Sequence, residues 1–99
     1  MAYTHRDVTA TLESRLALDP HARFRRFEDE GVIIQQTTAE AIVINATGAR
    51  LLELVDGARS LADCARALEG EFEAPGEVVA RDVVTFANEL LAAGVARVV

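Results

Sequence analysis

Hydrophobic positions recur with two different periods along the 99-residue chain. Between residues 23 and 45, β-branched residues form short runs, Val32-Ile33-Ile34 and Ile42-Val43-Ile44, separated by polar segments. Such runs are typical of β-strands. With a further candidate strand at residues 24–27 and a turn at Asp29-Glu30-Gly31, they predict a three-stranded antiparallel sheet. Gly31 is expected to supply a positive φ in this turn. Three short strands cannot close a barrel, so helices must cover one face and at least one edge must stay open.

After the third predicted strand the period changes to about 3.6, which indicates amphipathic helices. The pattern predicts three helices followed by a short strand at residues 95–99. The expected boundaries are capping and turn residues: Asn45 and Asp56-Gly57 for the first helix, Ser60 and Gly70 for the second, Pro75-Gly76 and Gly94 for the third. Three strands followed by three helices predict a winged-helix-like domain of the α+β class.

The first 22 residues are expected to form an N-terminal arm, with the domain spanning residues 23–99. Val8, Leu12 and Leu16 recur at i, i+4 and i+8, which is compatible with a short amphipathic helix. A loosely docked arm is the interpretation we favour, and Pro20 is expected to end any regular structure that precedes it.

Composition narrows the classes of function. The chain is 51% hydrophobic and 26% charged, has a net charge of −6, and contains no lysine. No run approaches the roughly 18 apolar residues of a membrane span, and the N-terminus lacks an apolar signal core, so we expect a cytoplasmic protein. An acidic surface argues against binding an anionic membrane or nucleic acid, although a winged helix raises DNA binding as an alternative. The second and third predicted helices offer no basic face that would support it.

Candidate catalytic chemistry is sparse. Cys64 is the only cysteine, and its neighbours Leu61 and Leu68 indicate a buried small side chain rather than a nucleophile. His5 and His21 lie in the N-terminal arm without carboxylate partners at fixed spacing. We therefore expect no metal, no cofactor and no enzymatic activity.

A series of short motifs resembles a known family. A hydrophobic strand ends in Asn, a helix closes on Asp-Gly, an Arg-Ser-Leu segment opens the next helix, and the third helix carries Asp-Val-x-x-Phe. In this chain the motifs occupy residues 42–48, 51–57, 59–63 and 82–86, and the pattern continues to Leu90 and Gly94-Val95. Residues 32–95 resemble the family typified by the pyrroloquinoline quinone biosynthesis protein D, also called the RiPP precursor peptide recognition element. The departures are Ala46, where an acidic residue often stands, and Ala87, where leucine is common.

The resemblance implies a function in peptide binding. Members of the family bind the leader of a ribosomally made precursor peptide and present it to a modifying enzyme, often a radical S-adenosylmethionine protein. The leader adds as a strand to the open sheet edge and lies against the third helix. The implied site comprises an edge strand, Ala41, Ile42, Val43, Ile44 and Asn45, and a helix wall drawn from Val78, Asp82, Thr85, Phe86 and Glu89.

Several of the residues in the implied site also fit a purely structural role. Ile42 and Ile44 also fit an ordinary sheet face, Phe86 fits the core, and Asp82 fits a local cap as well as a leader contact. Asn45 is most simply a helix cap. A second function from another class stays open, in which the domain is a general protein–protein adaptor or an oligomeric structural module without a leader peptide.

Overall fold

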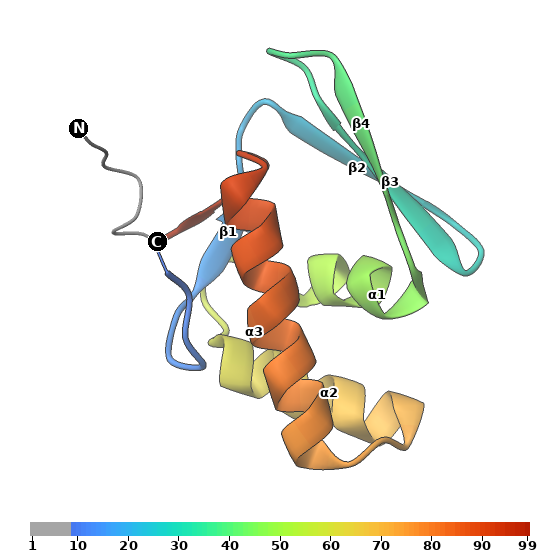
Figure 1. Cartoon of the computed structure of the whole chain (residues 1–99), viewed down its shortest axis with the longest axis vertical. Helices are drawn as coiled ribbons and strands as arrows, with labels where there is room; N and C mark the ends of the chain where they lie inside the picture. The colour runs from blue at the N-terminus through green and yellow to red at the C-terminus, as the bar shows by residue number, and fades with distance from the viewer. Residues whose placement is uncertain (1–8) are drawn as a thin grey trace.

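The computed structural model describes residues 9–99 and contains two small sheets and three helices (Figure 1). The elements, in chain order, are β1 (Leu16–Leu18), β2 (Ala22–Phe27), β3 (Glu30–Gln35), β4 (Glu40–Ile44), α1 (Ala46–Leu54), α2 (Leu61–Phe72), α3 (Gly76–Ala92) and β5 (Ala96–Val98). The predicted α+β, winged-helix-like order of a three-stranded sheet followed by three helices is confirmed.

The main sheet has the strand order β2-β3-β4, and both pairs are antiparallel. Side chains alternate between its faces. Ile33 pairs with Phe24 on one side and Ile42 on the other, and it is fully buried against the helices. Its neighbour Ile34 points the other way and is 41% exposed. One face of the sheet therefore belongs to the core and the other faces solvent.

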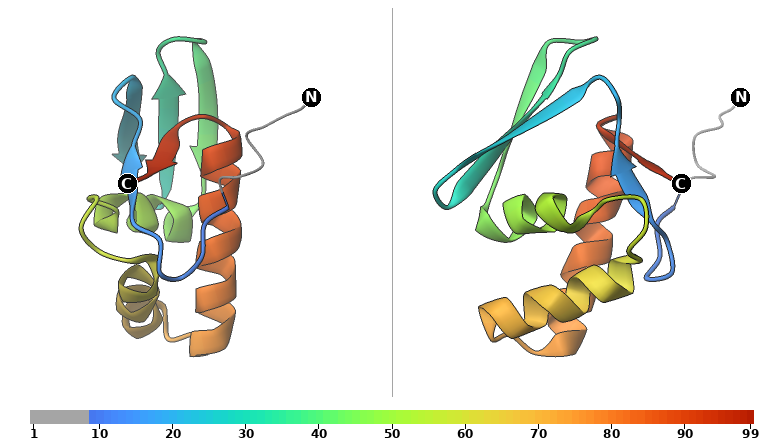
Figure 2. Two further views of the ribbon diagram at one scale, coloured as in Figure 1. Left: turned by 90° about the vertical axis from the view of Figure 1, so that its left-hand side faces the viewer. Right: turned by 180° about the vertical axis from the view of Figure 1, so that it is seen from behind.

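The helices form the rest of the core. α1 lies between the sheet and α2, whereas α3 runs beside both of them from the level of α2 up to the level of β4 (Figures 1 and 2). The N-caps follow the sequence prediction: the side chain of Asn45 accepts a hydrogen bond from the N–H of Gly48, and that of Ser60 from the N–H of Asp63. None of the helices in residues 9–99 is long and apolar enough to cross a membrane.

Two predicted turn positions are corrected. Gly31 does not supply a positive φ, because the left-handed residue of that hairpin is Glu28, with a φ of 52°. Gly31 instead lies within β3, where a Cβ would stand 2.6 Å from Cε1 of Phe24. The second helix does not end at Gly70 but continues to Phe72, and Glu73 is its left-handed C-cap.

The described part of the N-terminal segment is packed against the domain rather than loosely docked. Leu16 is fully buried in β1, which pairs with β5 at the other end of the chain. Ala10 is 1% exposed, and its N–H donates to Oδ1 of Asn88 on α3 at 2.7 Å. Residues 9–18 contain no helix, because the backbone that a helix would satisfy internally bonds to β5, Asn88 and the start of α2. Val8, the first residue of the proposed helix, lies outside the described residues.

Candidate functional site

The outer edge of β4 presents unpaired backbone groups. Within residues 9–99 no strand lies beyond β4 in the main sheet. The N–H of Gln36 donates to the C=O of His21 at 2.9 Å, in register with the β2–β3 ladder. Because hydrogen-bonded pairs alternate in an antiparallel ladder, odd-numbered residues of β3 bond to β4 and even-numbered residues bond to β2. Ala41 and Val43 therefore direct their N–H and C=O groups to the open edge.

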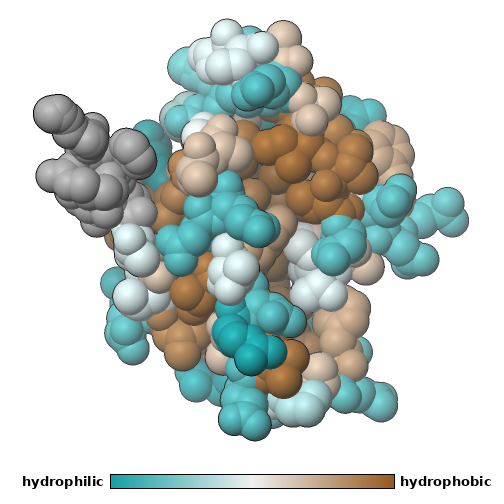
Figure 3. Space-filling view, in the orientation of Figure 1, coloured by the Kyte–Doolittle hydropathy of each residue, from teal (hydrophilic) through white to brown (hydrophobic). Residues whose placement is uncertain are grey.

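A groove runs from this edge along α3, and we divide it into three sections. The edge section has a volume of about 270 Å³ and lies between β4 and the C-terminal half of α3. Its walls are mainly apolar, with Ile42 and Ile44 on the strand and Phe86 and Leu90 on the helix. Hydrophobic side chains gather on the surface between the upper part of α3 and β4 in the space-filling view (Figure 3).

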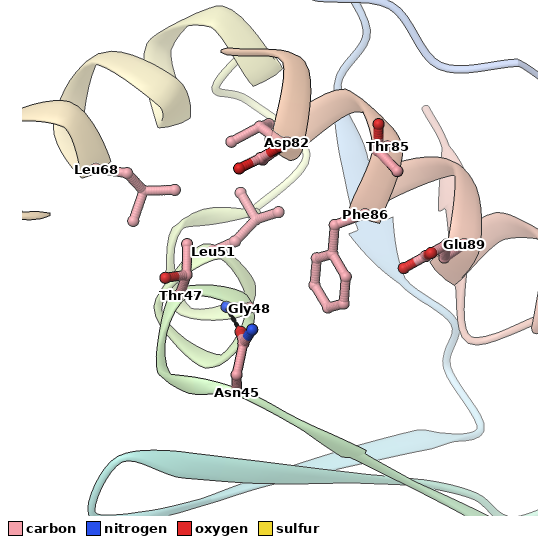
Figure 4. A pocket seen from close by; sticks show the side chains of 10 residues that line it. Asn45, Thr47, Gly48, Leu51, Leu68, Asp82, Thr85, Phe86 and Glu89 are labelled. Atoms are coloured by element: carbon pink, nitrogen blue, oxygen red, sulfur yellow. Dashed lines mark hydrogen bonds between the residues drawn. The ribbon is translucent and has the colours of Figure 1, made fainter. Parts of the chain in front are cut away.

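The central section has a volume of about 280 Å³ and lies between α3 and the N-terminus of α1. Phe86 points toward Gly48, and the carboxylate of Glu89 turns toward the Phe86 ring (Figure 4). A Cβ at Gly48 would stand only 2.8 Å from Cζ of Phe86. The glycine thus allows the aromatic ring to lie directly on the first turn of α1, where it forms part of the floor of the groove.

The third section, which we call the α2 section, is smaller, with a volume of about 90 Å³. It is lined by Leu68 and Phe72 from α2 and by Val78 and Val79 from α3. It shares Thr47, Leu68 and Asp82 with the central section. The central section likewise shares Asn45, Phe86 and Glu89 with the edge section. The three sections are therefore neighbours, with the central section between the other two, and we refer to them together as the groove.

Charge in the groove has one sign. Asp82 and Glu89 are its charged lining residues, and no arginine lines it in the described chain. The Asp82 carboxylate lies 4.0 Å from Arg81, and both side chains are mostly exposed. Arg50, the cation of α1, is bound to Glu71 of α2 at 2.8 Å, a hydrogen bond that lowers the pKa of Glu71. The residues that line the groove therefore carry only negative charge, beside apolar walls.

The structure brings together nearly all of the residues that the sequence assigned to the site. Ile42, Val43, Ile44, Asn45, Val78, Asp82, Thr85, Phe86 and Glu89 line the groove. Ala41 lines none of its sections, and its link to the site is its outward-facing backbone. Their role in binding a peptide stays a prediction. Asp82 does not cap α3, whose N-cap is Pro75.

Sequence reasoning missed the residues that α1 and α2 contribute. These are Thr47, Gly48 and Leu51 from α1 and Leu68 and Phe72 from α2. The one available signal in the sequence was Phe72, a large apolar residue close to the predicted end of the second helix, and the structure leaves it 41% exposed. The others look like ordinary members of helical patterns, and only the packing of the helices shows that they border an open space.

The described residues offer little other chemistry. Within residues 9–99 no group of three or more His, Cys, Asp and Glu side chains is placed to hold a metal ion. Cys64 is fully buried, and burial raises the pKa of its thiol. A thiol with a raised pKa is a weak nucleophile. Cys64 therefore acts as a small apolar side chain of the core, as its helical neighbours predicted.

The fold and the groove define a class, namely α+β, winged-helix-like domains whose open sheet edge faces a helix. Residues 30–96 match the family model described as Coenzyme PQQ synthesis protein D (PqqD). The match spans more than half of the chain, so the chain belongs to this family. The resemblance that the sequence motifs indicated is confirmed.

Two known proteins are similar to this chain. The PqqA binding protein of Gluconobacter oxydans (strain 621H) is 39% identical over 59 residues, which cover 60% of this chain and 62% of that protein. The chain thus spans less than two thirds of that relative. The solved structure of TbiB1 in complex with the TbiA(beta) leader peptide has a TM-score of 0.74 and 19% identity, and covers 81% of this chain and 93% of TbiB1. This second likeness shows that the two proteins share a fold.

Proposed function

We propose that this protein binds the leader of a ribosomally synthesised precursor peptide by strand addition and presents it to a modifying enzyme. The observation that carries the proposal is the outward-facing backbone of Ala41 and Val43, beside a groove walled by α3. The names of two similar proteins support it, since one binds PqqA and the other is found with a leader peptide. The protein itself acts as a carrier, and catalysis belongs to its partner, which in this family is often a radical S-adenosylmethionine protein.

The proposed binding mode uses both walls of the groove. An extended leader bonds to the N–H and C=O groups of Ala41 and Val43 and so becomes a further strand of the main sheet. Its side chains alternate in direction, and every second one enters the groove between Ile42, Phe86 and Leu90. Backbone bonds supply affinity that is independent of sequence, whereas the groove supplies selectivity.

A proline on each edge of the sheet tests this mode. Proline lacks the N–H that a strand donates, and edge strands tolerate it. Val43→Pro removes a donor that faces the open edge without touching the β3–β4 ladder. One net hydrogen bond is worth about 1 kcal/mol, and the proline ring also obstructs the incoming strand, so we expect roughly tenfold weaker binding. Calorimetric titration with a candidate precursor peptide encoded beside this gene measures the effect.

The matched control lies on the opposite edge. Arg26 of β2 pairs with Gly31, so its N–H faces away from β3 in the same way. Arg26→Pro should leave the affinity unchanged, and its exposed ion pair with Glu53 contributes little to stability. Equal affinities for the two folded variants would refute strand addition at β4. A protein that binds a whole enzyme but no precursor peptide would instead favour the general adaptor.

A further inference from the structure

We propose that the segment held in the groove carries a basic side chain between two apolar side chains. This inference rests on the proposed function and specifies the chemistry of the peptide. It follows from the order of the three sections: the edge section and the α2 section are mainly apolar, and the central section between them is the one that both carboxylates line.

The acidic centre is built by one helix. Asp82 and Glu89 are seven residues apart on α3, which is two helical turns, or roughly 10 Å. Phe86 lies between them on the same flank and turns its ring into the groove (Figure 4). A guanidinium or ammonium group placed over this ring meets a carboxylate on either side and the face of an aromatic ring. No other class of side chain satisfies all three groups.

The bound peptide covers the two carboxylates, and this burial makes the groove selective for a basic side chain. A peptide lying in the groove removes water from the carboxylates, and a carboxylate that loses water without gaining a partner is destabilised. Asp82 has Arg81 at 4.0 Å, but the side chain of that arginine is 74% exposed and lines no section of the groove. Within the described residues Glu89 forms no ion pair. A basic peptide side chain compensates for the lost water, an apolar one does not, and an acidic one adds repulsion.

The apolar neighbours follow from the flanking sections. Ile42, Ile44 and Leu90 offer an aliphatic surface on the side of β4. Leu68, Phe72 and Val79 offer a second one beside α2. Apolar peptide side chains at both ends remove these surfaces from water, since burial of apolar area is favourable at either site. The selected peptide therefore has the order apolar, basic, apolar along its length.

A displayed library of random twelve-residue peptides tests this inference. Peptides that bind the wild-type protein are selected, and those that also bind Val43→Pro are removed. The recovered peptides therefore depend on the β4 edge. We expect enrichment of arginine or lysine at one position, with apolar residues on both sides. A parallel selection on the double variant Asp82→Asn and Glu89→Gln should keep the apolar positions and lose the basic one.

Affinities of the recovered peptides complete the test. Replacing the basic residue by glutamine should weaken binding to the wild type by roughly three- to tenfold at low salt and hardly at all for the double variant. The inference would be overturned if the peptides that depend on the β4 edge lack a basic residue. It would also be overturned if selection on the double variant enriches the basic residue as strongly as selection on the wild type. Either result would leave strand addition intact. If no peptide distinguishes the wild type from Val43→Pro, the proposed function fails and this inference fails with it.

Discussion

The two flanks of α3 differ in what covers them. On one flank the chain covers itself, because the amide of Asn88 accepts from the N–H of Ala10 at 2.7 Å and donates to its C=O at 3.4 Å. On the other flank Phe86 and its neighbours face an open groove. A flank covered by the protein's own backbone contributes to folding, whereas a flank left beside an unpaired strand edge is available to a second chain. Variants on the two flanks should therefore separate stability from binding.

The largest expected effect is in the N-terminal segment, part of which covers one flank of α3. Leu16 follows the segment held by Asn88 and is fully buried. Leu16→Ala removes three heavy atoms from a packed site and leaves a cavity, so it should lower the free energy of unfolding by about 2–5 kcal/mol. Urea denaturation followed by circular dichroism measures this loss. Under conditions where the variant stays folded, its affinity for the leader should equal that of the wild type.

This outcome also separates two interpretations of the N-terminal segment. If the segment were a loosely docked arm, Leu16→Ala would change stability by no more than a typical surface substitution, about 0.5 kcal/mol. A loss of leader affinity without a loss of stability would mean that the N-terminal segment takes part in binding, and the comparison of the two flanks would then be wrong.

An intermediate effect is expected at the floor of the groove. In Gly48→Ala the new methyl group would stand 2.8 Å from Cζ of Phe86, so we expect the ring to move outward into the central section. Alanine favours the helix over glycine by roughly 0.5–1 kcal/mol, which offsets the displacement of the ring. The melting temperature should therefore change little, while leader affinity falls severalfold.

Gly70 provides a matched control for this variant. It lies inside α2, and a Cβ there would have no heavy atom within 4 Å. Gly70→Ala should raise the free energy of unfolding by about 0.5–1 kcal/mol and leave leader affinity unchanged. If both alanine variants bind the leader equally well, the position of the Phe86 ring does not determine binding.

The fold was predictable to the extent that its elements carry local signals. The β-branched runs, the caps at Asn45 and Ser60, and the change of period define the main sheet and the three helices. β1 was not predictable, because Leu16–Leu18 is short and its partner β5 is about 80 residues away in the sequence. The extension of α2 past Gly70 was not predicted for another reason. Glycine is tolerated inside a helix, and Glu73 adopts the left-handed conformation of the C-cap.

The candidate site was predictable only in part. Residues of β4 and α3 could be assigned because the family motifs cover them. The contribution of α1 and α2 depends on how the helices pack, as the contact between Gly48 and Phe86 illustrates. Neither residue has a neighbour in sequence that signals the contact. The backbone of Val43 faces the open edge, whereas that of Ile42 bonds to β3. This difference likewise depends on the register of the whole sheet.

The smallest expected effect on stability is at the rim of the groove. Thr85 is exposed on α3 and lines the central section. Thr85→Arg adds a long cationic side chain that can reach over the groove and pair with Asp82 or Glu89, so it competes with the leader. Exposed substitutions usually change stability by about 0.5 kcal/mol or less. Leader affinity should nevertheless fall by roughly tenfold, whereas the melting curve should overlay that of the wild type.

The same side chain placed elsewhere on α3 tests whether position matters. Ala92 is exposed in the last turn of α3 and lines no section of the groove. Ala92→Arg introduces the same charge and bulk, and a cation suits the C-terminal end of a helix. Its affinity should match the wild type. If Ala92→Arg weakens binding as much as Thr85→Arg does, the effect comes from net charge, and the open flank of α3 is not the surface that receives the leader.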